Sequence, residues 1–378
     1  MEFLPTTLGT RPRLAVEVRA EGVIAARAED AAALLTAVSK ANLAEGALTP
    51  GLKVGNLGDK AAVVAAVRKA LDGVAGTGRE RSRDVTLVVP DAAVRVLFLD
   101  FDQLPSKAAE ALPVVRFRLK KLLPFEADDA MVSYQLMSNV KGGLIKMVAV
   151  AMPKDVLAEY EGAVIAAGYL PGAVLPSTLA ALAGLDETEA PTLVVNAGPR
   201  GVTTAIVKAG ALLLHRSVDM GGGDASMIAV AADLPVPVAA GMRLVDRESS
   251  AQEWAQQEAL GPDGWDRFEE EARIQSSVAE VAALKESLAI AAAREVTQAV
   301  NVAVAYFEDT LQTSPDTILA AGTLGAETLA AMMEESGLQG LRVQEIVDAG
   351  MMQAGAVSST VAQMPKGWLA GVRGALKN

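Results

Sequence analysis

Two segments of the chain begin with the same pattern of strand, turn and strand, and this repeat strongly limits the folds that the chain can adopt. Residues 14–18 alternate as a strand, and Ala20-Glu21-Gly22 turns the chain into a second strand over 23–28. Residues 191–196, 197–201 and 202–207 repeat this strand, turn and strand. Helical segments follow both units, at a spacing of roughly 180 residues. The pattern predicts two α/β lobes with a ligand cleft between them. Two unrelated α/β domains remain the alternative.

Composition excludes several classes of chemistry. The 378 residues include no cysteine and one histidine, His215, so disulfides, thiolate nucleophiles and Cys/His zinc sites are excluded. With 34 basic and 46 acidic residues the net charge is −12, which disfavours nucleic acid as a partner. Aromatic residues make up only 4%, which argues against stacking platforms for single strands. We therefore expect no nucleic-acid partner.

No segment reads as a membrane span or a secretion signal. The start, MEFLPTTLGTRPR, lacks a cationic region followed by an apolar one. The two most apolar stretches, 225–241 and 288–307, are interrupted by charged residues or prolines. We expect a cytoplasmic protein that reaches a membrane only through a partner.

Between the two repeats the sequence predicts a small module. Strands are expected at 84–90, 93–100, 130–137 and 144–151, with helices at 107–123 and 154–167. Gly168 follows the second helix as an expected C-cap. We assign residues 88–172 to an α+β module inserted into the first lobe.

One stretch of this module carries a family resemblance. It runs LVVPDAAVRVLFLDFDQLP from Leu87 and continues as VVRFRLKKLLPFEADDAMVSYQ up to Gln135. The prolines and aromatic residues that mark its corners are Pro90, Pro105, Pro124, Phe125 and Tyr134, followed by Gln135. In this order and spacing the chain resembles the PilM family of type IV pilus assembly proteins, which are relatives of FtsA. The resemblance extends from Arg13 to about Ile346.

The resemblance implies a fold and a division into domains. The fold is α/β: an actin-like two-lobed fold with ribonuclease-H-like cores and a small α+β module inserted in the first lobe, as in FtsA. The first lobe takes residues 1–87 and about 173–188, and the module takes 88–172. The second lobe takes 189–225 and 313–350, and 226–312 forms its helical subdomain. Residues 351–378 form a C-terminal tail, which departs from the family's helical ending and reads as a short cationic amphipathic segment. We expect it to pack on its own domain, and docking on a membrane surface or a partner is the alternative.

Actin-like proteins hold ATP between two hairpin loops and a glycine-rich loop, and the first of these loops is eroded here. The family's Asp-Ile-Gly-Ser-Ser corresponds to a segment with Glu17 for the Asp, Arg19 for the Gly and Glu21 for a Ser. A carboxylate at Glu21 would repel a phosphate.

The other two loops retain more of the pattern. Asn196 replaces the family's magnesium-orienting Asp and loses its charge. The weak nucleotide-binding candidates are Asn196, Gly198, Arg200, Thr203, Gly322 and Gly325. We expect no catalytic residue, no metal site and no required cofactor. Binding of ATP or ADP with magnesium, without turnover, remains open.

The resemblance also implies a partner. In the PilM family the cytoplasmic N-terminal peptide of PilN, a bitopic inner-membrane protein, docks between the inserted module and the first lobe. Carried over, the candidate partner-binding residues are Arg116, Leu119, Leu123, Pro124 and Phe125. The cations Arg116, Arg118, Lys120 and Lys121 form either an ordinary solvated face or a contact for an anionic membrane or acidic partner.

These expectations lead to one favoured function and two alternatives. We expect a scaffold of the type IV pilus inner-membrane assembly complex, a pseudo-ATPase that binds a PilN-like protein and other pilus assembly proteins. One alternative is an active actin-like ATPase that regulates assembly by its nucleotide state. The other is the cytoplasmic part of a type II secretion assembly platform. His215, in a strand, is expected to be an ordinary hydrogen-bonded residue.

Overall fold

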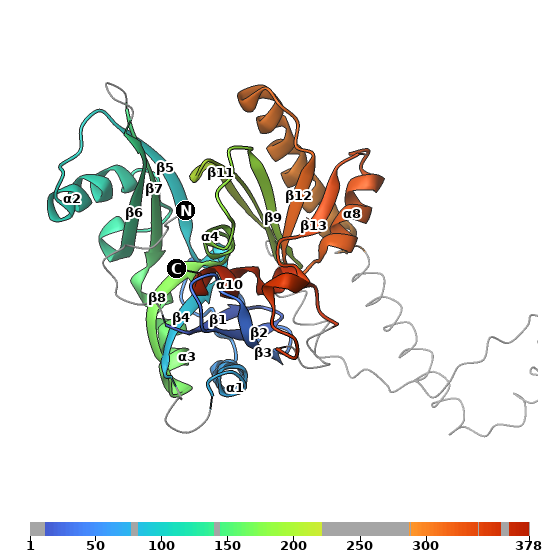
Figure 1. The fold of residues 1–378 in the computed structure, drawn as a ribbon. Helices are drawn as coiled ribbons and strands as arrows, with labels where there is room; N and C mark the ends of the chain where they lie inside the picture. The colour runs from blue at the N-terminus through green and yellow to red at the C-terminus, as the bar shows by residue number, and fades with distance from the viewer. Residues whose placement is uncertain are drawn as a thin grey trace, which may run out of the picture. The chain divides into compact units, whose positions relative to one another are not determined.

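The computed structural model describes residues 12–76, 82–139, 144–220, 287, 289–338, 340–356 and 363–377. The chain divides into two compact units, one formed by Met1–Gly221 with Arg294–Asn378 and the other by Gly222–Ala293. Most of the second unit, and with it most of the predicted helical subdomain 226–312, lies outside the described residues. The first unit contains everything described below (Figure 1).

The first lobe is built on a five-stranded sheet in the order β3-β2-β1-β4-β8. The hairpin predicted at its start is confirmed, with β1 at Leu14–Arg19 antiparallel to β2 at Gly22–Ala28. β3 (Leu35–Asn42) extends the hairpin, while β4 (Asp84–Val89) and β8 (Leu170–Pro176) add in parallel on the other side.

The second lobe repeats this arrangement. Its sheet has the order β11-β10-β9-β12-β13, which is the same sequence of antiparallel and parallel neighbours as in the first sheet. Its strands are β9 (Thr192–Gly198), β10 (Gly201–Lys208), β11 (Ala211–Asp219), β12 (Thr317–Gly322) and β13 (Arg342–Glu345). The internal duplication predicted from the sequence is thereby confirmed.

Each sheet buries helices on the face turned away from the other lobe. α1 (Lys60–Asp72) has Asp59 as its N-cap, whose Oδ1 accepts the Ala62 N–H at 2.9 Å. α1 and α3 (Lys154–Ala166) pack together, and their apolar faces share one core with the first sheet. On the second sheet the corresponding face is covered by helical residues 294–311 and by α8 (Ala326–Glu335).

A separate three-stranded sheet, β5-β7-β6, lies between β4 and β8 in the chain. It consists of β5 (Arg95–Phe101), β6 (Ala130–Asn139) and β7 (Ile145–Pro153), and α2 (Ala108–Leu119) covers one face of it. We call residues 95–153 the module. The sequence-based range 88–172 also includes α3, whose buried residues belong to the core of the first lobe.

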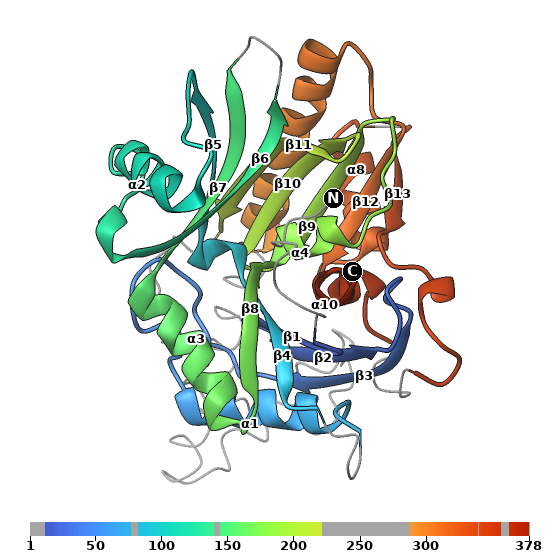
Figure 2. The same cartoon turned by 60° about the vertical axis from the view of Figure 1, so that its left-hand side comes forward.

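Two short helices lie between the sheets of the two lobes (Figure 2). α4 (Ser177–Ala183) follows β8, and α10 (Ala370–Leu376) comes from the C-terminal part of the chain. Every residue of α10 is buried, and it packs on α4, β1, β2 and β12. The core cluster around these helices takes Ile24 from one sheet and Val194 from the other, so it joins the two lobes.

The position of α10 decides between the two hypotheses for the end of the tail 351–378. The end of the tail packs on the rest of the protein, and two of its cations bond there. Arg373 Nη1 donates to the Gly184 carbonyl at 2.8 Å, and Lys377 Nζ donates to Asp186 at 2.7 Å. Arg373 is 9% exposed, and α10, to which it belongs, is a part of the core.

Candidate functional site

The three loops predicted to hold a nucleotide meet at one place between the lobes. Because β9 and β12 are parallel neighbours, their carboxyl ends lie side by side, and Gly322 pairs with Ala197. The β1–β2 turn of the first lobe approaches them, since Glu21 Oε1 accepts the Thr323 hydroxyl at 2.7 Å. The loops therefore surround a common junction, which we call the interlobe junction.

Arg19 occupies the centre of this junction. Its Nε donates to Glu17 Oε1 at 2.7 Å, and its Nη2 donates to Ser177 Oγ at 2.5 Å and to Asn196 Oδ1 at 2.9 Å. The three acceptors come from β1, from the first residue of α4 and from β9. The guanidinium thus bonds to both lobes.

Glu17 is buried completely under α10. Its Oε1 also accepts the Ser177 hydroxyl at 2.6 Å, whereas its Oε2 has no hydrogen-bond partner. Burial raises the pKa of Glu17 by more than the neighbouring Arg19 lowers it. Gly371 makes this approach feasible, because a Cβ there would lie 2.5 Å from Glu17 Oε2.

A second carboxylate, Asp91, orders the other side of the junction. It accepts the backbone N–H and the hydroxyl of Thr178, at 3.0 and 2.5 Å. Asn196 Nδ2 in turn donates to the oxygens of Thr178 and Ser177, at 2.9 and 3.0 Å. The sequence analysis missed Asp91, Ser177 and Thr178. The available signal was the segment Leu-Pro-Ser-Thr, which places two hydroxyl groups where a buried helix begins.

The predicted nucleotide-binding residues have different surroundings. Asn196, Gly198 and Gly322 lie at the junction, where a Cβ on Gly322 would lie 2.6 Å from Asn196 Oδ1. Gly325 lies against Pro365 instead. Thr203 is buried and donates to Ser217 Oγ on β11 at 3.0 Å, and Arg200 is in the β9–β10 turn.

The residues at the junction do not suit a magnesium-bound phosphate. Glu17 Oε1 and Asn196 Oδ1 accept hydrogen bonds from the Arg19 guanidinium, so a positive charge already occupies the space beside them. Glu21 Oε1 lies 2.8 Å from where a Gly198 Cβ would be, so a carboxylate fills the approach to the second hairpin. Among the described residues, no group of three His, Asp or Glu side chains is arranged to hold a metal.

An open pocket of about 460 Å³ lies at the mouth of the junction. Lys40, Thr323 and Met364 line it together with Trp368, and the Lys40 ammonium stands 4.2 Å from the centre of the Trp368 ring. Partial burial lowers the pKa of Lys40. The segment that leads into α10 thus forms one wall of the mouth.

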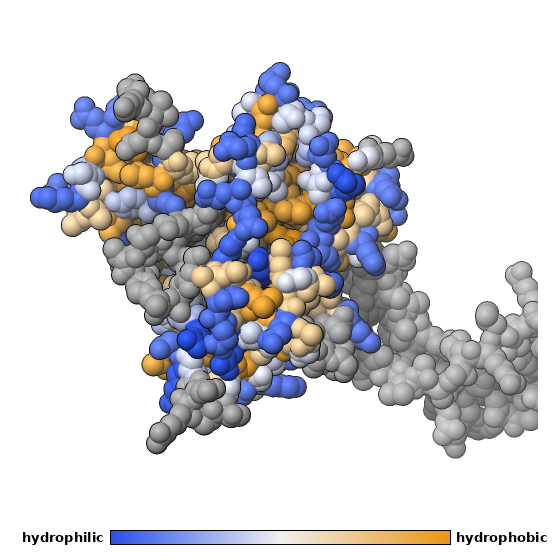
Figure 3. Space-filling model, in the orientation of Figure 1, coloured by the Kyte–Doolittle hydropathy of each residue, from blue (hydrophilic) through white to orange (hydrophobic). Residues whose placement is uncertain are grey.

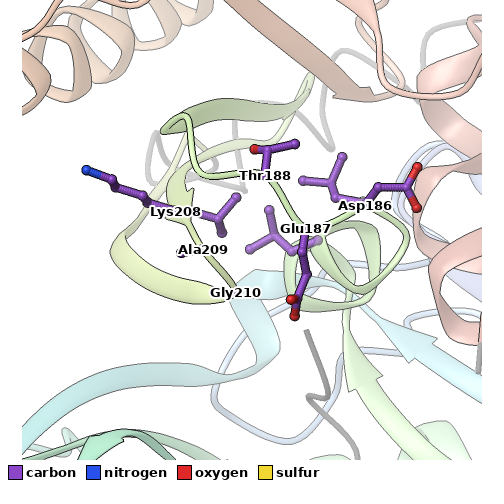
Figure 4. A pocket seen from close by; sticks show the side chains of 9 residues that line it. Asp186, Glu187, Thr188, Lys208, Ala209 and Gly210 are labelled. Carbon is purple, nitrogen blue, oxygen red and sulfur yellow. The ribbon is translucent and has the colours of Figure 1, made fainter.

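A second pocket, behind α4, is too small to be a ligand site. It lies where the segment after α4 meets the β10–β11 turn, with Glu187 beside Gly210 (Figure 4). Its volume of about 10 Å³ accommodates about one water molecule.

The candidate partner-binding residues of the module differ in exposure. Leu119 is fully buried, and Leu123 and Phe125 pack on the same core under α2. Pro124 is exposed. The neighbouring Phe117 is 70% exposed and Leu122 is 49% exposed, although sequence reasoning did not select them.

The basic face of α2 is smaller in the structure than in the sequence. Arg116 Nη1 donates to the carbonyls of Ala127 and Ala130, and Lys120 Nζ pairs with Asp128 at 2.7 Å. Arg118 and Lys121 remain exposed on the outer side of the helix, next to Phe117. Two of the four cations therefore hold the module together.

His215 makes a hydrogen bond to its own backbone, as expected of a strand histidine, but only one of its ring nitrogens is satisfied in this way. Its Nε2 is shut off from solvent and has no hydrogen-bond partner. Burial lowers the pKa of His215, and the nearby carboxylate of Asp91 opposes this shift.

Comparisons with known proteins place the fold. No family model matches the chain, and no curated protein matches it. Among solved structures, a chain of the PilM-PilN type IV pilus biogenesis complex is similar over 97% of this chain and 98% of its own length, with a TM-score of 0.64 and 17% identity. The ethanolamine utilization protein EutJ from Carboxydothermus hydrogenoformans has a TM-score of 0.42 and 11% identity, over 97% of this chain and 89% of its own. The cytoplasmic domain of EpsL from the Vibrio cholerae type II secretion system has a TM-score of 0.36 and 12% identity, over 58% of this chain and 74% of its own.

The duplicated sheets and the hairpin loops that meet between them define an actin-like fold. Within that class, the chain has the fold of the pilus-complex chain with which it aligns over nearly its whole length. The resemblance seen in the sequence is thereby confirmed at the level of the fold. Among the described residues, no helix is long and apolar enough to cross a membrane.

Proposed function

We propose that this protein is a scaffold of a type IV pilus or related secretion assembly complex. It works by binding a partner, and it is a pseudo-ATPase. The fold shared with a chain of the PilM-PilN complex supports the setting. The contacts of Arg19 and Glu21 support a role without nucleotide chemistry.

The module is the proposed binding surface. Seven of the twelve large hydrophobic side chains exposed among the described residues belong to it or to its strand connections. Figure 3 shows hydrophobic atoms gathered over strands β5 to β7 on the face in view. An exposed concentration of this kind marks an interaction site in a folded protein. This single observation carries the proposal.

The partner we propose is the cytoplasmic N-terminal peptide of a PilN-like inner-membrane protein. The α2 surface consists of Val114, Phe117, Arg118, Lys121 and Leu122, with Pro124 at its end. Its apolar side chains would anchor the peptide, and its two cations would select acidic or polar flanking residues. In this proposal the protein is cytoplasmic and is held at the inner membrane by its partner.

Calorimetry with a synthetic peptide tests the proposal. The peptide from the N-terminus of a PilN-like protein of the same organism is expected to bind with a Kd of about 1 µM or lower. Phe117→Ser should weaken binding by roughly 30-fold, as expected for an exposed aromatic anchor. Ile165→Ser is the matched control, because Ile165 on α3 is 57% exposed but lies outside the module. Absence of heat at high peptide concentration, or equal loss in both variants, would contradict the proposed surface.

A further inference from the structure

The chain supplies its own cation to the interlobe junction. The guanidinium of Arg19 makes three hydrogen bonds of 2.9 Å or less, and its side chain is 12% exposed. Its acceptors are a carboxylate, a hydroxyl and an amide oxygen, and each of these is held by a further contact. Ser177 donates to Glu17, and Asn196 donates to Ser177 and Thr178. The acceptors are therefore positioned as a built site rather than as incidental contacts.

We propose that Glu17, Ser177 and Asn196 form an internal guanidinium-binding site with Arg19 as its resident ligand. Arg19 lies where an actin-like fold would hold a nucleotide and its cation. It therefore joins the two lobes without a bound nucleotide. The site takes a planar cation because its acceptors bond to two different nitrogens of the group, Nε and Nη2. Lysine presents a single ammonium and cannot reproduce this fork.

A second hydrogen bond, between Glu21 and Thr323, also joins the two lobes at the junction. Glu21 and Thr323 bond across the lobes at 2.7 Å, and Gly198 lies so close that a Cβ there would meet both side chains within 3 Å. Arg19 and Glu21 come from the same hairpin, two residues apart. One hairpin thus carries both the group that fills the cation position and the group that blocks the approach for phosphate. This arrangement does not depend on the proposed partner peptide.

Chemical rescue tests the proposal on the full chain. Arg19→Ala should lower the thermal midpoint of unfolding. Guanidinium chloride at about 10 mM, roughly ten times a millimolar Kd and far below denaturing concentrations, should then raise the midpoint of the variant. The same concentration of sodium chloride or urea should not raise it, and guanidinium should leave the midpoint of the wild type unchanged or slightly lower. Arg118→Ala, at an exposed arginine of α2, should show no rescue.

Two further measurements keep the proposal falsifiable if Arg19→Ala does not fold. In the wild type, the Nε–H of Arg19 should exchange with solvent at least about a hundred-fold more slowly than the Nε–H of an exposed arginine. Its NMR signal is assigned as the one that disappears in Arg19→Lys. Magnesium-ATP should not shift the thermal midpoint of the wild type. Fast exchange of the Arg19 Nε–H, a magnesium-dependent stabilisation by ATP, or equal recovery of Arg19→Ala with sodium chloride would overturn the proposal. Peptide binding by the module is a separate readout, so either proposal can fail alone.

Discussion

At the scale of single residues, glycines set how closely the two central helices approach. In α10, a Cβ on Gly374 would lie 1.8 Å from the Ala180 carbonyl oxygen of α4. On the facing helix, a Cβ on Gly184 would lie 3.2 Å from the Cα of Gly374. Since these obstacles are backbone atoms, no side-chain rotation can relieve the collision. The packing of α4 on α10 therefore depends on the absence of side chains at these two positions.

We predict that Gly374→Ala destabilises the protein by at least about 2 kcal/mol, within the range for overpacking a core. Gly162→Ala is the control, because Gly162 lies within α3 and a Cβ there meets nothing within 4 Å. That substitution should stabilise the protein by about 0.5–1 kcal/mol, since alanine favours a helix over glycine. Urea unfolding of both variants measures the difference. Similar free energies of unfolding for the two variants would show that the helices separate at little cost.

At the scale of elements, α10 is the part of the fold that joins the lobes most completely. Its apolar residues belong to the core cluster shared by both sheets, and Leu376 at its end is 3% exposed. Truncation of such a side chain removes buried area and leaves a cavity.

We predict that Leu376→Ala lowers the free energy of unfolding by about 2–5 kcal/mol. The control is Ile165→Ala, which shortens a side chain that is 57% exposed and should cost less than about 1 kcal/mol. Thermal unfolding followed by circular dichroism is the measurement. A small effect of Leu376→Ala would mean that α10 is only loosely attached to the two lobes.

The sequence predicted the strands well where hydrophobic alternation was strong. The hairpins of β1–β2 and β9–β10 and the helices α2 and α3 were expected near their observed positions. α10 was not expected, because its two glycines disfavour a helix and its cations resemble a surface segment. Their carbonyl and carboxylate partners lie about 190 residues earlier in the chain, and local pattern carries no information about such contacts. β3, β8 and β13 were missed for a similar reason, since their register is set by neighbouring strands. α4 was missed because it is short and buried on all sides, so that it has no polar face to give a helical pattern.

The position of the candidate site could be predicted, but the contacts that its residues make could not. The three loops were located from the resemblance, and the substitutions at Glu17, Arg19 and Asn196 indicated a loss of nucleotide chemistry. The sequence could not show that Arg19 bonds to Asn196, 177 positions away. It also could not show which α2 side chains face outward. Leu119 and Phe117 are both apolar residues of one helix, and only packing distinguishes them.

At the scale of the whole molecule, one effect of pH on stability can be assigned to a particular residue, because the chain has a single histidine. Burial holds the pKa of His215 below its ordinary value of 6.5. The unfolded chain therefore binds a proton more readily than the folded protein as the pH falls. The contribution to stability is present above the unfolded pKa and is lost as the pH falls towards and through the folded pKa. Asp91 moderates this loss.

We predict that the wild type loses more stability than His215→Gln between about pH 7.5 and pH 5.5. Urea unfolding of both proteins at the two pH values measures the difference. Glu17, whose raised pKa favours the folded state at lower pH, is present in both proteins and cancels in the comparison. Parallel losses in the two proteins would show that His215 titrates in the folded state as it does in the unfolded chain.

The contact of α10 with β1 also has a consequence for how the protein is made. Roughly 350 residues separate the two elements, which corresponds to about 20–70 s of synthesis at ordinary elongation rates. During that interval the face of the first sheet that α10 later covers is open to other chains, although the strands that surround it have already emerged from the ribosome. The newly made N-terminal lobe is therefore a natural client for a chaperone until its own C-terminal helix arrives.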